Sequence, residues 1–379
     1  MPDHDLILRG ARVIDPSQNI DRVTDVRFTA GKVAAIGDDL VAGPGTEVRD
    51  LRGKIVTPGL IDLHTHVYWG GTAIGVDAVA LARSSATATF VDAGTAGPGN
   101  FPGFRKHVIE PVLPVRILPL LNLSFAGIFA FSGTVMVGEC EDLRLLDLRE
   151  CARVAREHAD LIVGIKVRVG RGASGASGIA PMDMALEVAE ATGLPLMAHL
   201  DHPPPSRMDV MARLRKGDIL THCFRPFPNA PSLPGGGVRP EVLAARERGV
   251  IFDIGHGAGS CGFETSRAML AAGFKPDVIS SDVHILSING PAFDLLQTLA
   301  KFHALGMGLS EVIACGSTNA GKAIRRPDLG TLKVGGVGEA SIIEILDEST
   351  EHRDVLGEMI TADKRFVARG LVLDGKWWT

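Results

Sequence analysis

Residues 57–66 read TPGLIDLHTH, a Thr-Pro-Gly turn followed by an apolar run that ends in two histidines separated by one residue. A short apolar run after such a turn is typical of a buried strand. Alternate residues of a strand project to the same side, so His64 and His66 share one face and could bind one metal ion. A lone His-x-His pair is also compatible with hydrogen-bonded histidines, so the rest of the chain must decide between the two interpretations.

Eight strand-like runs alternate with segments of helical period between residues 59 and 284. The runs are GLIDLHTH (59–66), ATATFVDAG (86–94), VRILPLLNL (115–123), LIVGIKVRV (161–169), LPLMAHL (194–200), DILTHCF (218–224), VIFDIGHG (250–257) and DVISSDVH (277–284). Helical period is clearest over residues 141–160, and residues 308–324 after the last run are also expected to be helical. Eight βα units predict an α/β fold, a (β/α)8 TIM-type barrel, over residues 58–325.

The two ends of the chain have a different texture, with short β-branched segments between Gly, Asp and Pro. Residues 6–16, 23–37 and 47–59 are typical of a small antiparallel sheet, and residues 328–346 and 365–375 return to strand-like pieces. We predict that residues 1–57 and 326–379 together build a small β-sandwich domain. Trp377 and Trp378 are expected to cover this domain.

Composition argues against several classes of partner. The chain has 379 residues, is 45% hydrophobic and carries a formal net charge of -5, which gives no electrostatic reason to expect nucleic acid or an anionic membrane. It shows no signal-peptide pattern and no apolar run long enough to cross a bilayer, so we expect a cytoplasmic protein. The five cysteines lack CxxC spacing and are expected to be buried and reduced.

Polar side chains that could bind a metal stand at the ends of several predicted strands. Lys166 ends the fourth run, and three further residues end later runs: His199, His222 and Asp282. Barrel enzymes keep their chemistry at this rim, where these side chains would meet the histidine pair. Each has a structural alternative, as an ion-pair member, a hydrogen-bonded histidine or a helix cap. Their common placement favours the functional interpretation.

The motifs TPGLIDLHTH, GIKVRV, LMAHL, LTHCF and ISSDVH, in this order, resemble the amidohydrolase superfamily, in the group of dihydroorotases and aminoacylase-like deacetylases. The resemblance covers essentially the whole chain, including VTPGLID and DLGTLKVGGVGEA near its ends. It implies a hydrolase with two divalent cations, Zn2+ being the expected metal. It also implies the ligands: His64, His66 and Asp282 on one metal, His199 and His222 on the other, and carbon dioxide bound to Lys166 as a carbamate that bridges both.

The carbamate has a physical rationale, because two dications close together need an anionic bridge that an ammonium group cannot provide. A buried lysine beside metals loses its proton readily and can then capture carbon dioxide. The resemblance further implies attack by a metal-bridged hydroxide, with Asp282 carrying the proton to the leaving group.

The residues after the histidine pair bear on the substrate. Dihydroorotases usually carry an arginine shortly after this pair, whereas residues 67–71 here read VYWGG. The flanking runs look more like the deacetylase-like subgroup, which hydrolyses the amide or ester bond of small N-acyl amino acids or O-acyl hydroxy acids. A cyclic-amide hydrolase of dihydroorotase or hydantoinase type, a mononuclear deaminase and a degenerate non-catalytic barrel stay as alternatives. A homo-oligomer is compatible with the family, although no sequence patch establishes one.

Candidate substrate contacts follow from position alone. Arg168 lies two residues beyond Lys166 and points to the same side of its strand, where it could bind a substrate carboxylate or pair with a barrel acid. Tyr68, the only tyrosine, borders the pocket or packs within a loop. The other candidates are polar loop residues: His256 and Asn289 as substrate contacts, and His202 and His284 in loop or supporting roles.

Overall fold

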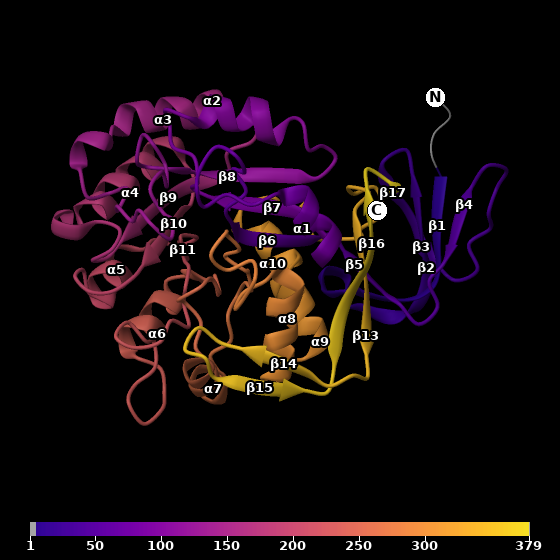
Figure 1. Ribbon diagram of the computed structural model, residues 1–379. Helices are drawn as coiled ribbons and strands as arrows, with labels where there is room; N and C mark the ends of the chain where they lie inside the picture. The colour runs from indigo at the N-terminus through magenta and orange to yellow at the C-terminus, as the bar shows by residue number, and fades with distance from the viewer. Residues whose placement is uncertain (1–4, 379) are drawn as a thin grey trace.

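A curled parallel sheet forms the centre of the molecule, and helices surround it (Figure 1). The computed structural model describes residues 5–378. Seven strands follow one another in chain order: β6 (Leu60–Thr65), β7 (Thr87–Ala93), β8 (Arg116–Asn122), β9 (Gly164–Val169), β10 (Leu196–Leu200), β11 (Ile219–Leu220) and β12 (Ile251–Phe252). Each lies inside a run predicted from the sequence. A parallel sheet is covered on both faces, which explains why these runs are apolar almost throughout.

The eighth predicted run, residues 277–284, closes the barrel without forming a regular strand. Isolated parallel bridges join Asp253 to Val278 and Thr65 to Val283. Between them the backbone N–H of Asp282 donates to the carbonyl of His64 at 2.7 Å. Asp282 itself has a φ of 49°, which interrupts an extended strand. The TIM-type architecture is therefore confirmed, with an irregular eighth element.

Helices and short turns connect the strands. They are α1 (Ala78–Ser85), α2 (Phe101–Phe104), α3 (Leu148–Glu157), α4 (Ala180–Thr192), α5 (Arg207–Arg213), α6 (Pro240–Glu247), α7 (Phe263–Ala271), α8 (Leu295–Ala304), α9 (Leu309–Cys315) and α10 (Thr318–Ala323). The helix predicted over residues 141–160 begins only at Leu148. Asp147 caps it by accepting the backbone N–H groups of Arg149 and Glu150, and the chain before this cap includes a short 3-10 helix, Leu143–Leu145.

Strands from both ends of the chain combine in a second sheet. Its order is β17-β16-β13-β5-β1-β2-β3, with β4 paired to β1. The strands are β1 (Asp5–Asp15), β2 (Ile20–Thr29), β3 (Lys32–Gly37), β4 (Glu47–Asp50), β5 (Ile55–Pro58), β13 (Ala340–Leu346), β16 (Arg365–Leu373) and β17 (Lys376–Trp378). This confirms that the two ends meet in one extra sheet beside the barrel.

The extra sheet is mixed and not simply antiparallel as predicted. Strand β1 pairs in parallel with β4 along residues 6–9 and with β5 along residues 12–13. Gly10, at a φ of 70°, lies at the register shift between these two segments, so one long strand can change partner. Trp377 lies against this sheet under the guanidinium of Arg49, 4.2 Å from its ring centre.

A hairpin of β14 (Thr350–Arg353) and β15 (Met359–Ala362) lies against the barrel helices α7 and α8 (Figure 1). Asp354 Oδ2 accepts the N–H of Phe263 at the start of α7 at 2.8 Å. Lys301 of α8 donates to the carbonyl of Arg353 at 2.9 Å. The C-terminal segment thus holds the barrel at a second place, away from the extra sheet.

The interior agrees with the expectation of a reduced apolar core. All five cysteines are free and buried. Within residues 5–378, no helix is both long enough and apolar enough to cross a membrane.

Candidate active site

Six buried side chains meet at the carboxyl-terminal rim of the barrel, and they are the six predicted from the sequence. None is more than 8% exposed: His64, His66, Lys166, His199, His222 and Asp282. Ligand atoms of three of them, His64, His222 and Asp282, all lie within 4.8 Å of one another. The strand ends therefore bring together residues that are more than 200 positions apart in the chain.

The cluster has two parts that meet at Lys166 and His64. In one part, Asp282 Oδ1 lies 3.2 Å from His66 Nε2 and 3.4 Å from His64 Nε2. In the other, His199 Nδ1 lies 2.6 Å from His222 Nε2. Lys166 Nζ is 3.4 Å from His64 Nε2, and the rings of His64 and His222 are 5.1 Å apart. The arrangement resembles two adjoining donor sets with an amine beside them.

Hydrogen bonds behind the histidines set their tautomers. His64 Nδ1 lies 2.8 Å from Thr221 Oγ1, and this hydroxyl donates to Asp253 Oδ2 at 2.7 Å. The hydroxyl oxygen must then accept the Nδ1 proton of His64. Similarly, His222 Nδ1 donates to the carbonyl of Gly255 at 2.7 Å. Both histidines consequently turn an Nε2 lone pair toward the cluster, which is what a metal ligand requires.

Three glycines make room for this crowding. A Cβ on Gly257 would lie 2.2 Å from Asp282 Oδ2, and one on Gly94 would lie 2.6 Å from Lys166 Cγ. A Cβ on Gly255 would lie 3.0 Å from His64 Nδ1. All three glycines have a positive φ. Any larger residue would displace a side chain of the cluster.

Two members of the cluster have a backbone conformation that non-glycine residues rarely adopt. The φ of His222 is 63° and that of Asp282 is 49°. Such a conformation costs roughly 1–3 kcal/mol per residue and persists where the surroundings enforce it, commonly at functional sites. Here it turns both side chains into the cluster.

Burial shifts the pKa values of these side chains in the direction that favours their neutral forms. It lowers the pKa of Lys166 to about 7 and raises that of Asp282 to about 6. Burial, followed by repulsion from Lys166, also lowers the pKa of His64 and His66 well below the usual value. Neutral imidazoles and a lysine that loses its proton near neutrality are the forms needed for metal binding and for carbamate formation.

Comparison with known proteins identifies the family. The model of the amidohydrolase family matches residues 55–378. The chain belongs to the amidohydrolase family. A deacetylase of Agrobacterium fabrum is 32% identical over 90% of this chain and 83% of the relative. A deacetylase of Brucella anthropi is 31% identical over 94% of this chain and 88% of the relative. This amidohydrolase is therefore a metal-dependent hydrolase.

Solved structures agree on the architecture of this amidohydrolase. The crystal structure of an adenine deaminase is 26% identical with a TM-score of 0.91, covering 99% of this chain and 100% of that one. A dihydroorotase structure is 29% identical with a TM-score of 0.89, covering 99% and 98%. In sequence, by contrast, a dihydroorotase of Geobacter sulfurreducens matches only 22% of this chain and 20% of its own length, at 44% identity.

Two buried aspartates that the sequence analysis did not single out support the rim of this amidohydrolase. Asp62 accepts the hydroxyl of Ser281 at 2.5 Å and its N–H at 2.9 Å, beside Asp282. Asp253 accepts the hydroxyl of Ser280 at 2.7 Å. Burial raises the pKa of both carboxyl groups to about 7. The alternation in DLHTH was the available signal for Asp62, because it lies two residues before His64 on the same face.

Arg168 lies near the cluster but is paired with an acid of the same chain. Its Nη1 is 3.5 Å from Oε2 of the buried Glu139, and its guanidinium stacks 5.0 Å from the ring centre of Phe131. Of the two roles open from the sequence, the structure thus favours pairing with a barrel acid. His284 lies beside it, with its ring 6.0 Å from that of His66 and 5.7 Å from that of Phe131.

Tyr68 packs within its loop. Its ring stacks on Phe104 at 4.5 Å, and its hydroxyl lies 3.4 Å from the carbonyl of Asn100. The side chain is 9% exposed, so most of its surface serves the packing of this loop.

His256 and Asn289 occupy places that differ from each other. His256 is fully buried; its Nδ1 bonds the carbonyl of Gly257 at 3.0 Å and its Nε2 lies 2.8 Å from Lys301 Nζ. Both ring nitrogens therefore have partners within the chain, and a contact of His256 with substrate stays a prediction. Asn289 is exposed on the loop after Asp282, and His202 is exposed on the loop after β10.

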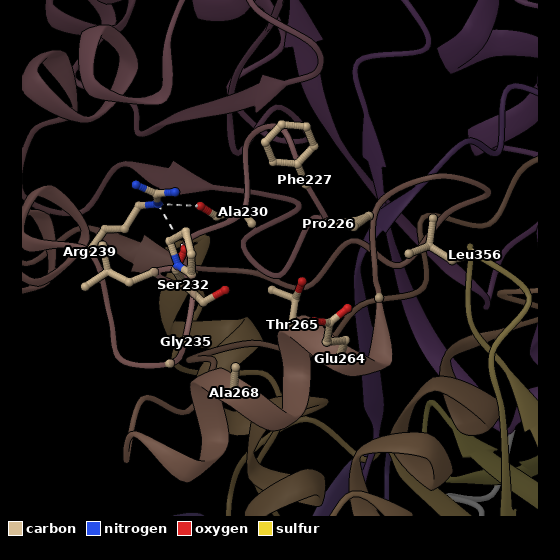
Figure 2. A pocket seen from close by; sticks show the side chains of 14 residues that line it. Pro226, Phe227, Ala230, Ser232, Gly235, Arg239, Glu264, Thr265, Ala268 and Leu356 are labelled. Atoms are coloured by element: carbon tan, nitrogen blue, oxygen red, sulfur yellow. Dashed lines mark hydrogen bonds between the residues drawn. The ribbon is translucent and has the colours of Figure 1, made fainter.

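A surface pocket of about 410 Å3 is formed by other residues (Figure 2). Its wall combines the loop after β11 with the start of α7 and includes Phe227, Glu264 and Leu356. Arg239 fixes that loop by donating to the carbonyls of Ala230 and Ser232 at 3.1 and 3.0 Å (Figure 2). None of the six clustered side chains lines this pocket, so we place the chemistry at the rim.

Proposed function

We propose that this amidohydrolase is a binuclear deacetylase-type hydrolase that cleaves the amide or ester bond of a small N-acyl amino acid or O-acyl hydroxy acid. The observation that carries the proposal is the meeting of four histidines, one lysine and one aspartate at the rim. Similarity over most of both chains to proteins named deacetylase supports this substrate class over dihydroorotate. The absence of an arginine in residues 67–71 supports it as well.

The residues fit a pair of divalent cations. His199 Nδ1 and His222 Nε2 face each other at 2.6 Å, with the proton of His199 between them. A cation that replaces this proton would have both nitrogens as ligands. The buried His199 Nε2, which has no hydrogen-bond partner among the described residues, would then carry the proton. Imidazoles with a carboxylate are a donor set that zinc prefers.

In the proposed arrangement, His64, His66 and Asp282 would hold one cation and His199 and His222 the other, and Lys166, as a carbamate, would supply a further anionic ligand. When bound, such cations lower the pKa of a water molecule toward neutrality and polarise a carbonyl group. Asp282 then accepts a proton and returns it to the leaving nitrogen or oxygen. Lys166 is suited to carbamate formation because burial already lowers its pKa to about 7.

A substrate panel tests the proposal. Zinc-loaded protein is assayed with N-acetyl amino acids, O-acetyl hydroxy acids and their cyclic counterparts, dihydroorotate and hydantoins. We expect turnover of open acylated acids and little turnover of cyclic amides. Preference for a cyclic amide would instead support the second candidate, a cyclic-amide hydrolase, which the fold of the dihydroorotase structure favours. No turnover by protein that holds two metals would contradict both.

A further inference from the structure

Arg225 is a cation beside the cluster that forms no ion pair with the residues that the structure describes, although the nearby Asp201 and Asp282 favour its charged form. It follows His222 by three residues in the loop after β11, and its backbone N–H donates to the carbonyl of His222 at 3.0 Å. Nη2 donates to Ser260 Oγ at 2.8 Å. Nε is buried without a partner, and no carboxylate of residues 5–378 forms an ion pair with this guanidinium. A charge in such a place is expected to bind an anion from outside the chain.

The neighbouring arginine is already neutralised. Arg168 pairs with Glu139 and stacks on Phe131, so its charge is compensated within the chain. Both arginines act on the same histidines, since each contributes to the lowered pKa of His199. Next to burial, Arg225 is the largest cause of the lowered pKa of His222. Burial lowers the pKa of Arg225 itself to about 10, which still leaves it charged at neutral pH.

We propose that Arg225 binds the carboxylate of the acylated acid and makes the enzyme prefer acidic over neutral acyl compounds. This inference rests on the proposed function, which it deepens by naming the group that selects the acid. A guanidinium with unused N–H donors matches the planar geometry of a carboxylate. The hydrogen bond from Arg225 to the backbone of His222 keeps this anchor at a fixed place relative to a metal ligand. A small acid could then reach Arg225 while its acyl carbonyl lies at the cluster.

Binding of a matched pair of probes tests the inference without turnover. Zinc-loaded Asp282→Asn protein is titrated calorimetrically with N-acetylalanine and with its neutral amide, N-acetylalaninamide. The parent should bind the acid more tightly than the amide. In this background, Arg225→Met should weaken binding of the acid roughly ten- to hundredfold, the range for a lost charged hydrogen bond. The affinity for the amide should stay unchanged. Arg225→Lys should recover part of the loss.

Arg171→Met serves as the control, because Arg171 is exposed on the loop after β9 and its removal changes the net charge equally. It should leave both titrations unchanged. Equal weakening of acid and amide by Arg225→Met would overturn the inference, as would equal binding of the two probes by the parent. Loss of the acid preference in Arg168→Met and not in Arg225→Met would also overturn it. If the preference depends on Arg225 but the active enzyme hydrolyses no acylated acid, carboxylate binding by Arg225 is supported and the proposed reaction is contradicted.

Discussion

The barrel has a regular half and an irregular half, and the proposed metal ligands come from both. Strands β6 to β10 are five to seven residues long, and the ladders from β7 to β10 have no register shift, whereas the β6–β7 ladder has two. Strands β11 and β12 have two residues each, and the eighth element forms isolated bridges. In the irregular half, buried side chains replace part of the ladder, since Asp253 accepts the hydroxyls of Thr221 and Ser280.

This difference explains where the two proposed ligands with a positive φ lie. Lys166 and His199 extend from regular strands in ordinary conformations, whereas His222 and Asp282 have a positive φ. A continuous ladder would hold the backbone extended and turn these two side chains elsewhere. In the irregular half, strand pairing is reduced and two proposed ligands are turned toward the cluster. Variants in the two halves should have different consequences.

Asp282→Asn in the irregular half should have the largest effect. Proton transfer by a positioned side chain is worth about 100- to 10,000-fold in rate, and the amide cannot perform it. We expect kcat to fall by that range while the protein keeps much of its zinc, with kcat and zinc content measured on the same sample. Asp363→Asn, at an exposed position between β15 and β16, is the matched control. Substantial residual turnover in metal-loaded Asp282→Asn protein would remove Asp282 from proton transfer.

The two threonines behind the histidines compare the halves directly. Thr221 supports His64 from the irregular half, and Thr95 supports His66 from the regular half at 2.8 Å. Loss of a hydrogen bond behind a metal ligand costs about 10- to 100-fold in metal affinity. Thr221→Val should reach the upper end of this range, because it also removes a donor from Asp253. Zinc affinity is measured by competition with a chelator. Equal affinities of Thr221→Val and Thr95→Val would contradict the expected difference between the two halves.

Glycine substitutions in the two halves should affect different properties, turnover in one half and metal content in the other. Gly257→Ala crowds Asp282 and Gly94→Ala crowds Lys166, both at a positive φ, so each should lower the free energy of unfolding by about 1–3 kcal/mol. We expect Gly257→Ala to reduce turnover at full metal content and Gly94→Ala to reduce the metal content itself. Denaturant unfolding and metal analysis give both quantities. Unchanged stability in either variant would show that the neighbouring side chain moves aside freely.

The smallest effect is expected at Asn289, which the sequence analysis named as a substrate contact. Its side chain is exposed in the loop after Asp282. If it touches substrate, Asn289→Ala should raise KM by roughly five- to tenfold, the worth of one hydrogen bond, with kcat unchanged. An unchanged KM would assign Asn289 to the loop surface.

Much of the rim could be predicted because it depends on local pattern. The two-residue period of DLHTH places His64 and His66 on one face, and the apolar runs place the strand ends. The irregular eighth element could not be predicted, since the φ of Asp282 depends on contacts with Gly257 and His64.

The importance of Glu139 and Arg225 was also hidden from the sequence. Whether an arginine forms an ion pair is decided by residues distant in the chain: Arg168 pairs with Glu139, whereas Arg225 forms no ion pair within residues 5–378. The parallel pairing of β1 with β4 and β5 is likewise a non-local property, so a run of short strands was interpreted as antiparallel.

The central claim is that six side chains hold two cations with a modified lysine between them. The most direct measurement is a crystal structure of protein produced with zinc and bicarbonate, with anomalous data collected at the zinc edge. We predict two anomalous peaks, one beside His64, His66 and Asp282 and one beside His199 and His222, with density extending from Lys166 Nζ to both. An unmodified Lys166 turned away from the histidines, or a single peak at full zinc loading, would contradict the account.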